Sequence, residues 1–208
     1  MKTTLLRRTV ELFIGLFAIA ALFTVIRIVG SMLRGEFGVV TWPVQAEAIS
    51  TVVALTDNAT ISFPDGKLSI AGEPFAHAIE SGAYLGSLGL FILVLLILRE
   101  ILTGFAEGRV LTQENAISLR KIAWLLFGVC GISVIQAFAL QPLILSAVAV
   151  PRGMVLHPSV SWDIAGYSNI WLHYEPPLVT FLLGGLALLF SFALQSGAEY
   201  RQDSESLI

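Results

Sequence analysis

The sequence predicts a membrane protein with four transmembrane α-helices and a small extracytoplasmic β layer built from its two outer loops. Three observations lead to this fold class. Of the 208 residues, 56% are hydrophobic and only 13% are charged, with a mean hydropathy of +0.82. Soluble domains carry about 25% charged residues. Because this chain has so few, part of its surface must be surrounded by lipid. The chain also has four apolar runs and, between them, segments rich in β-branched residues.

The four spans are predicted from runs that approach the ~20 apolar residues a transmembrane helix needs. They cover about residues 12–33, 82–98, 122–144 and 178–194. The second and fourth are short, so we expect their helices to extend beyond the apolar core. The first has a basic start, but its apolar run exceeds the ~7–15 residues of a signal-peptide core and ends without a small-residue cleavage site. We therefore expect an uncleaved anchor.

The direction of the spans follows from Lys and Arg, which are enriched in cytoplasmic loops. Eight of these residues fall on one side of the spans and four on or near the other. The sequence therefore predicts that both termini, a helical hairpin at 99–121 and a tail at 197–208 are cytoplasmic. Segments 34–81 and 145–175 are predicted to be extracytoplasmic and rich in β structure.

The β prediction for these outer segments rests on local patterns. "ATISFPDGKLSI" places two strands around Pro64-Asp65-Gly66, where proline presets a turn and glycine accepts a left-handed backbone. "FGVVTW" and "STVVAL" are rich in β-branched residues, and the second segment offers "AVAVP", "SVSWDI" and "NIWLHY". We expect one small sheet from both segments. Pro176-Pro177 are expected to open the fourth helix, whose first turn needs no N–H donors.

The stretch "GFAEGRVLTQENAISLRKIAW", residues 104–124, is the polar connector between the second and third spans. Gly108 suits the left-handed position that ends a helix. Thr112 is expected to cap the next helix by accepting a hydrogen bond from the N–H of Asn115, while Glu114 complements the helix dipole. Asn115 stands where a full capping box has Glu or Gln, so the box is partial. The stretch predicts a tight helical hairpin.

Several residues of this connector form a longer pattern, namely Phe105, Gly108, Leu111-Thr112, Glu114-Asn115 and Leu119-Arg120-Lys121-Ile122. The pattern resembles F-x-x-G-x-x-F-T-x-E-N-x-x-x-L-R-x-I-G of the bacterial family catalogued as "domain of unknown function 2975", with Leu111 in place of Phe and Ala123 in place of Gly. The closing "SGAEYRQDSESLI" resembles that family's tail. The resemblance implies a four-span bacterial inner-membrane protein without an established activity. Members are often associated with small helix-turn-helix regulators.

The charged residues of the hairpin are candidate partner-binding residues: Glu107, Arg109, Glu114, Arg120 and Lys121. A connector that only joined two spans could be a few polar residues, whereas this one specifies a helix stop and a helix cap. Together with residues 199–208, these side chains would form an inner surface for a protein partner or a second copy of the chain. The alternative is that the charges only anchor the helices in the bilayer.

Charges near the outer ends of the spans are expected to be structural. Arg27 in the first span and Glu80 before the second are predicted to form an ion pair, or Glu80 to pair with Arg34, in preference to a proton path. No metal site is predicted, because none of the histidines shows close ligand spacing; these are His77, His157 and His173.

Glycines on the second span predict close helix contact. Gly82 and Gly86, followed by Gly89, make a face of small residues, and Gly184-Gly185 are expected to do the same on the fourth span. The sequence leaves open whether the contact lies within the bundle or with another subunit.

The function class follows from what the sequence lacks. It shows no paired carboxylates, nucleophile–base pair or metal motif, so we expect no catalytic residue and no cofactor. The net charge is −3 and there is no basic tract, which argues against nucleic-acid binding. The leading hypothesis is a non-enzymatic multi-pass inner-membrane protein, an accessory or signalling-type component that binds partner proteins within the lipid bilayer. The alternatives are a small transporter or channel and, third, a membrane enzyme.

Overall fold

The structure is a computed structural model of the whole chain. It describes residues 2–35, 37, 39–46, 53–56, 59–62, 67–70, 72–110, 112–147, 155–157, 169–172, 174 and 176–206. Two compact units divide the chain. Unit 1 comprises Met1–Val25, Tyr84–Ile132 and Pro177–Ile208, and unit 2 comprises Ile26–Ala83 and Ser133–Pro176.

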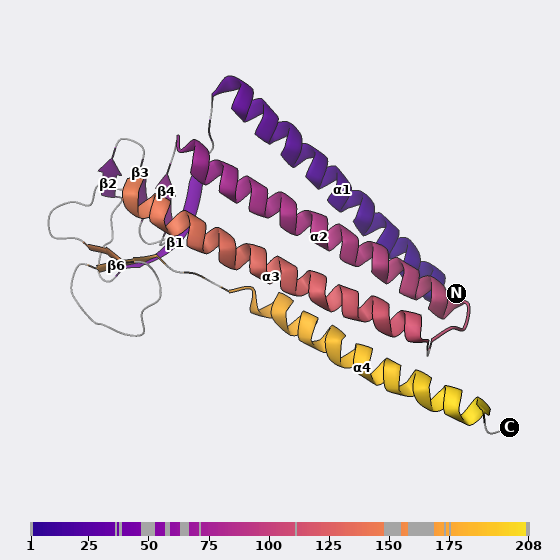
Figure 1. Cartoon of the computed structure of the whole chain (residues 1–208). Coiled ribbons are helices and arrows are strands. Elements are labelled where there is room, and N and C mark those ends of the chain that lie inside the picture. The colour runs from indigo at the N-terminus through magenta and orange to yellow at the C-terminus, as the bar shows by residue number, and fades with distance from the viewer. Residues whose placement is uncertain are drawn as a thin grey trace. The chain divides into compact units, whose positions relative to one another are not determined.

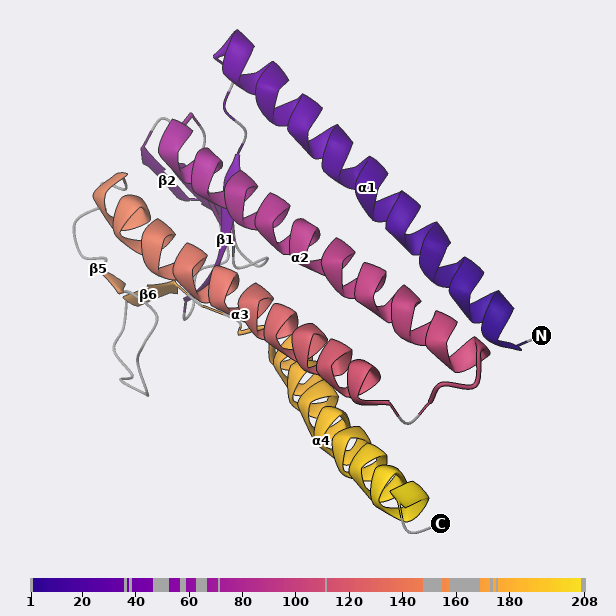
Figure 2. The same cartoon turned by 45° about the vertical axis from the view of Figure 1, so that its right-hand side comes forward.

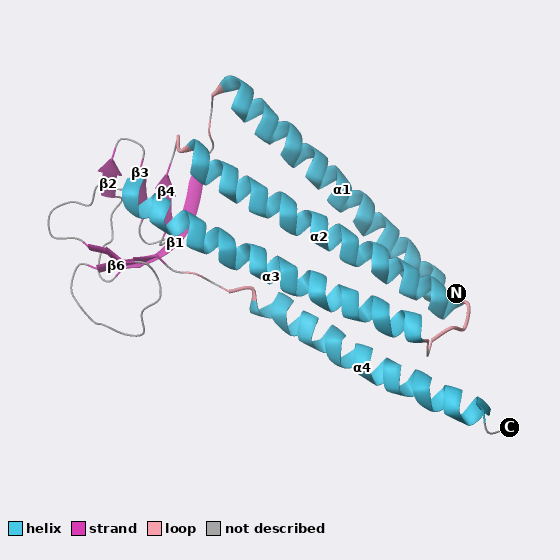
Figure 3. Ribbon diagram, in the orientation of Figure 1, coloured by secondary structure: helices cyan, strands magenta, loops and turns pink. Residues whose placement is uncertain are grey.

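Helices make up most of the described chain (Figures 1 and 3). They are α1 (Lys2–Arg34), α2 (Pro74–Ala106), α3 (Gln113–Ala147) and α4 (Leu178–Ser206). Each contains a segment long and apolar enough to cross a membrane, at Leu5–Arg34, Pro74–Ala106, Gln113–Ile144 and Leu178–Tyr200. The prediction of four apolar helices of membrane-spanning length is confirmed, and α4 begins directly after Pro176-Pro177 as expected.

The helices extend beyond the predicted spans. Because α2 begins at Pro74, the last residues of the predicted β-rich segment 34–81 are helical. Likewise, α4 continues to Ser206, so the predicted tail at 197–208 is helical up to that residue. The physical reason is that a helix satisfies its own backbone hydrogen bonds in lipid and in water alike, and therefore need not end at the membrane surface. Proline at the first helical position removes only an N–H that would have no helical acceptor.

Unit 1 is a helical bundle with a small buried core on α2, α3 and α4, made of Ile101, Ile122, Ala123, Leu126 and Ala187. The rings of Phe17 on α1 and Phe91 on α2 stack with centroids 6.4 Å apart. Figures 1 and 2 both show that, within this unit, α2 lies between α1 and α3. The start of α1, the α2–α3 turn and the end of α4 lie at the same end of the unit.

Glycine permits a close contact between α2 and α3. A Cβ atom built on Gly86 would lie 3.2 Å from the Cδ1 atom of Ile132, and one built on Gly128 would lie 3.2 Å from a leucine of α2. A Cβ atom at Gly82 or at Gly89 would meet nothing within 4 Å. The predicted small-residue face is therefore only partly used, since Gly86 alone of the three faces α3 at this distance.

The contact between α3 and α4 is closer still. A Cβ atom built on Gly184 would lie 2.9 Å from the Phe127 ring, a distance that real Cβ atoms essentially never show. The Phe127 ring lies in turn 5.9 Å from Trp124 and 5.3 Å from Phe181, centroid to centroid. A Cβ atom on the neighbouring Gly185 would meet nothing within 4 Å. Gly184 is therefore the residue that lets α4 approach this group of rings.

Unit 2 contains the strands. They are β1 (Val40–Ala46), β2 (Val53–Thr56), β3 (Ala59–Ser62), β4 (Lys67–Ile70), β5 (Val155–His157) and β6 (Asn169–Leu172). Their order in the sheet is β2-β3-β4-β1-β6-β5. Val40–Pro43 of β1 pair antiparallel with β4, and Val44–Ala46 pair antiparallel with β6, which pairs in parallel with β5. Pro43, which has no N–H to donate, lies where β1 changes partner.

Several of the strands lie in the segments that the sequence patterns predicted. The two strands expected around Pro64–Gly66 are β3 and β4, and they pair antiparallel. Strand β5 was not expected, and "AVAVP" and "SVSWDI" lie outside the described residues apart from Ala147. The described side chains of β1 and β4 alternate, with Val40, Trp42 and Ile70 buried and Thr41 exposed. On which side of a membrane these strands lie stays a prediction.

Candidate functional site

The end of α2 is closed by its own backbone. Gly108 has a φ of 79°, the left-handed conformation predicted for it. The N–H of Gly108 donates to the carbonyl oxygen of Phe105 (3.1 Å), and the N–H of Arg109 donates to that of Gly104 (2.9 Å). These two bonds form a Schellman motif, which satisfies carbonyl groups that a helix end leaves unpaired. The chain therefore leaves α2 in a specified direction.

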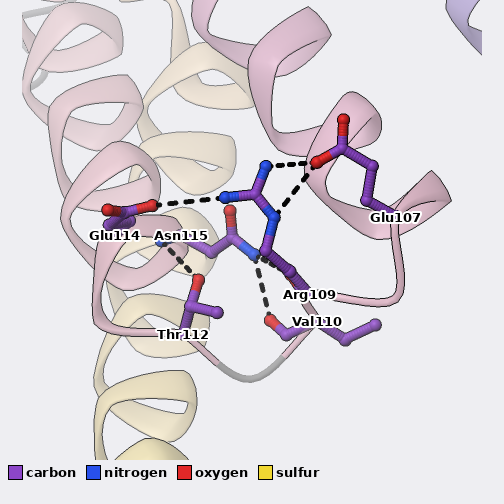
Figure 4. A network of polar contacts seen from close by, with 6 residues as sticks. All are labelled: Glu107, Arg109, Val110, Thr112, Glu114 and Asn115. Atoms are coloured by element: carbon purple, nitrogen blue, oxygen red, sulfur yellow. Dashed lines mark hydrogen bonds and ion pairs between the residues drawn. The ribbon is translucent and has the colours of Figure 1, made fainter.

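The start of α3 is capped as the sequence predicts (Figure 4). The hydroxyl oxygen of Thr112 accepts a hydrogen bond from the N–H of Asn115 (3.2 Å), and the Thr112 carbonyl accepts from the N–H of Ala116 (3.2 Å). Thr112 is thus the N-cap of α3. The cap and the Schellman motif leave only a few residues between two fixed helix ends.

The side chain of Asn115 has a role that the sequence did not reveal. It is buried, with 7% of its surface exposed, and its Nδ2 group donates to the carbonyl oxygens of Arg109 (2.6 Å) and Val110 (3.1 Å). It also lies against α2, since a Cβ atom on Gly104 would be 3.6 Å from its Oδ1 atom. Asn115 therefore fixes the loop between the helices and does not complete a capping box. The one available signal was an amide residue at the position where a box has Glu or Gln.

Charged side chains cover the outside of this turn (Figure 4). Arg109 donates to the carboxylate of Glu107 through Nε (3.1 Å) and Nη2, and its Nη1 atom lies 3.9 Å from the carboxylate of Glu114. All three side chains are more than half exposed. The hydrogen bond from Arg109 to Glu107 and the charge of that carboxylate raise the pKa of Arg109, so the guanidinium is charged at every accessible pH. We call Glu107, Arg109 and Glu114 the turn cluster.

Arg120 does not belong to the turn cluster. Its half-buried side chain points to α4, where Nη2 donates to the amide oxygen of Gln195 (2.7 Å) and the guanidinium carbon lies 5.3 Å from the ring centroid of Phe192. Gln195 in turn donates to the carboxylate of Glu199 (3.1 Å). The Nε atom is buried and has no hydrogen-bond acceptor among the described residues. Lys121, the last of the predicted partner-binding residues, is exposed.

Two more polar contacts in unit 1 join separate helices and were not expected from the sequence. One carboxylate oxygen of Glu11 accepts hydrogen bonds from Arg7 (3.0 Å) on its own helix and from Arg99 (2.9 Å) on α2. The hydroxyl of Ser191 on α4, which is fully buried, donates to the carbonyl oxygen of Ala116 in the first turn of α3 (2.8 Å). Arg7 and Glu11 are four residues apart on one helix, whereas the contacts with Arg99 and Ser191 join residues far apart in the chain.

The described part of unit 2 does not contain the ion pair that the sequence predicted between Arg27 and Glu80. No salt bridge joins Arg27 to Glu80 among the described side chains, although the two residues are near each other in unit 2. Pairing of Glu80 with Arg34 stays a prediction. His77 is buried, and neither of its ring nitrogens has a hydrogen-bond partner in the described part of the chain.

Within the described residues, no three His, Cys, Asp or Glu side chains gather as a metal site would require. The side chains of His157 and His173 are not among those that the structure describes. Comparison of the sequence with family models and curated proteins, and of the fold with solved structures, finds no match. The candidate functional site is the turn cluster, because its exposed charges stand on a backbone held by the Schellman motif, Thr112 and Asn115.

Proposed function

We propose that this chain is a non-enzymatic multi-pass protein of the bacterial inner membrane, an accessory or signalling-type component that binds a partner through its α2–α3 turn on the cytoplasmic side. The observation that carries the proposal is the combination of an exposed turn cluster with a fixed backbone beneath it. Glu107 and Arg109 are solvent-exposed, yet the Schellman motif, the Thr112 cap and the Asn115 side chain hold the chain that bears them.

A fixed turn suits recognition because binding then requires little further ordering of the loop. Charged groups at the edge of an interface favour correct partners and disfavour wrong ones, and they act mainly on specificity and association rate. The arrangement of one cation between two carboxylates presents a defined charge pattern, with Arg109 between Glu107 and Glu114. The partner is a protein or a second copy of this chain. The family resemblance of residues 105–122 supports the bacterial setting.

The test exchanges the charges of the turn cluster without removing their ion pair. In the double variant Glu107→Arg with Arg109→Glu, the two side chains still attract each other, so stability should stay close to that of wild type. The pattern seen by a partner is inverted. We expect the variant to insert in the membrane normally and to lose the protein that copurifies stoichiometrically with wild type in mild detergent, or to lose the wild-type oligomer mass.

Thr112→Ala is the matched control. It removes the N-cap of α3 and should lower stability by about 1 kcal/mol without altering any charge. Below its unfolding temperature it should therefore keep the partner. A charge-exchange variant that folds, inserts and retains every wild-type partner and the wild-type mass would show that the turn cluster is not a binding surface.

A further inference from the structure

The cations at the end of unit 1 that carries the turn fall into two groups. In the first group each cation has a carboxylate. Arg7 and Arg99 share Glu11, with distances of 3.0 and 2.9 Å, and Arg109 lies between the two acids of the turn cluster. Each of these guanidinium groups therefore has a carboxylate partner, although Arg7 and Arg99 keep one net positive charge between them because they share Glu11.

Arg8 on α1 belongs to a second group, together with the adjacent residues Arg120 and Lys121. No salt bridge of these three residues is present among the described side chains, and the group that accepts the hydrogen bond from Arg120 is the neutral amide oxygen of Gln195. The carboxylate of Glu199 is bonded to the other end of that amide. Contacts with Gln195 and with the Phe192 ring hold the guanidinium in place without cancelling its charge. Two adjacent positive charges without a carboxylate partner therefore lie on α3, about two helical turns after its first residue.

The position of this pair is the border between polar and apolar surface. The apolar run of α3 begins immediately afterwards, at Ile122. Trp124, one helical turn after Arg120 and Lys121, is 64% exposed. Tryptophan is enriched at the level of lipid headgroups, where its apolar body and its N–H are both accommodated. An exposed tryptophan one helical turn after two basic residues adds an apolar contact to an anion-binding group.

We propose that Arg120 and Lys121 bind the phosphate of an anionic phospholipid, with Trp124 alongside the part of the lipid below the headgroup. Basic residues near a membrane surface attract anionic lipids, and long basic side chains reach the headgroup level from within a helix. A free phosphate ion would use the same two cations but would gain nothing from the exposed ring of Trp124. The site is separate from the turn cluster and does not depend on the proposed partner.

The test measures lipid retention on the full chain. Wild type purified in neutral detergent is incubated with phosphatidylglycerol or, as a neutral lipid, phosphatidylcholine, and bound lipid is counted by native mass spectrometry. We expect wild type to retain phosphatidylglycerol selectively and Lys121→Gln to bind it about fivefold more weakly. Lys121 is exposed and makes no salt bridge in the described part of the chain, so this variant should fold.

Two matched variants separate a site from general attraction. Arg8→Gln removes another exposed cation that has no salt bridge among the described residues, this one on α1, and the variant should bind as wild type does. Lys121→Arg keeps the charge and should also bind normally. Equal losses in Lys121→Gln and Arg8→Gln, or a loss in Lys121→Arg, would overturn the proposal. Displacement of phosphatidylglycerol by millimolar inorganic phosphate would contradict the proposal that the ligand is a lipid. It would assign the site to soluble phosphate.

Discussion

Within unit 1, α3 and α1 are attached in different ways. α3 is held by buried contacts. Its residues Ile122, Ala123 and Leu126 form much of the core, and Asn115 closes the turn before it. In α1, by contrast, no residue of the apolar 18-residue stretch that could cross a membrane is buried. Its contacts with α2 include the stacked Phe17 ring and the exposed bridge through Glu11.

The difference follows from the solvent. In water, an apolar helix would have to bury its surface, but lipid is as apolar as a leucine side chain and gives no hydrophobic reason for α1 to pack. A helix in lipid is positioned by close van der Waals contact and by polar contacts between helices. α3 has both kinds, through glycines and through buried hydrogen bonds. The stability of the bundle should therefore depend on α3 far more than on α1.

The largest effect is expected for Asn115→Ala. The substitution leaves the carbonyl oxygens of Arg109 and Val110 without their donor and opens the contact with Gly104, so unfolding free energy should fall by about 3 kcal/mol. Thermal unfolding in detergent measures this change. Gln113→Ala, exposed two residues earlier, is the control and should lie within about 0.5 kcal/mol of wild type. Equal stability of the two variants would show that the Asn115 side chain does not contribute to the attachment of α3.

Gly184→Ala should have the next largest effect. The added methyl group would lie 2.9 Å from the ring of Phe127, which the rings of Trp124 and Phe181 confine. We expect α4 to be displaced and unfolding free energy to fall by about 2 kcal/mol, as in overpacked cores. The control is Gly185→Ala, where the methyl group meets nothing within 4 Å and alanine favours the helix. If Gly185→Ala lost as much stability, the α3–α4 contact would not be set by Gly184.

The smallest effect is expected on the α1 side. Glu11→Gln breaks the bridge to Arg7 and Arg99, but all three side chains are more than a third exposed, so the loss of stability should be the smallest of the three. It should vanish at about 1 M salt, where charges are screened beyond about 3 Å. Glu100→Gln, an exposed acid of α2 without a salt bridge in the described residues, is the control. A loss as large as that of Asn115→Ala would contradict the contrast between α1 and α3.

Local features of this protein could be predicted from sequence, because neighbouring residues decide them. The apolar runs mark the four helices, Gly108 ends α2, Thr112 caps α3, and the segments beside Pro64–Gly66 form the strands β3 and β4. The charged residues of the turn were also identifiable, since they interrupt the apolar pattern. Each of these features depends on backbone geometry and on the solvent within a few residues.

What the sequence by itself determined is therefore the number of apolar helices, the position of their apolar cores and the chemistry of the turn between α2 and α3. The tertiary structure alone decided which helix faces meet. It placed Gly86 but not Gly82 against α3, turned Arg120 toward Gln195, and brought Arg99 to Glu11. The physical reason is that lipid-facing and protein-facing surfaces of a membrane helix are equally apolar, so hydrophobicity does not mark the buried side. Only the fit of side chains between helices does.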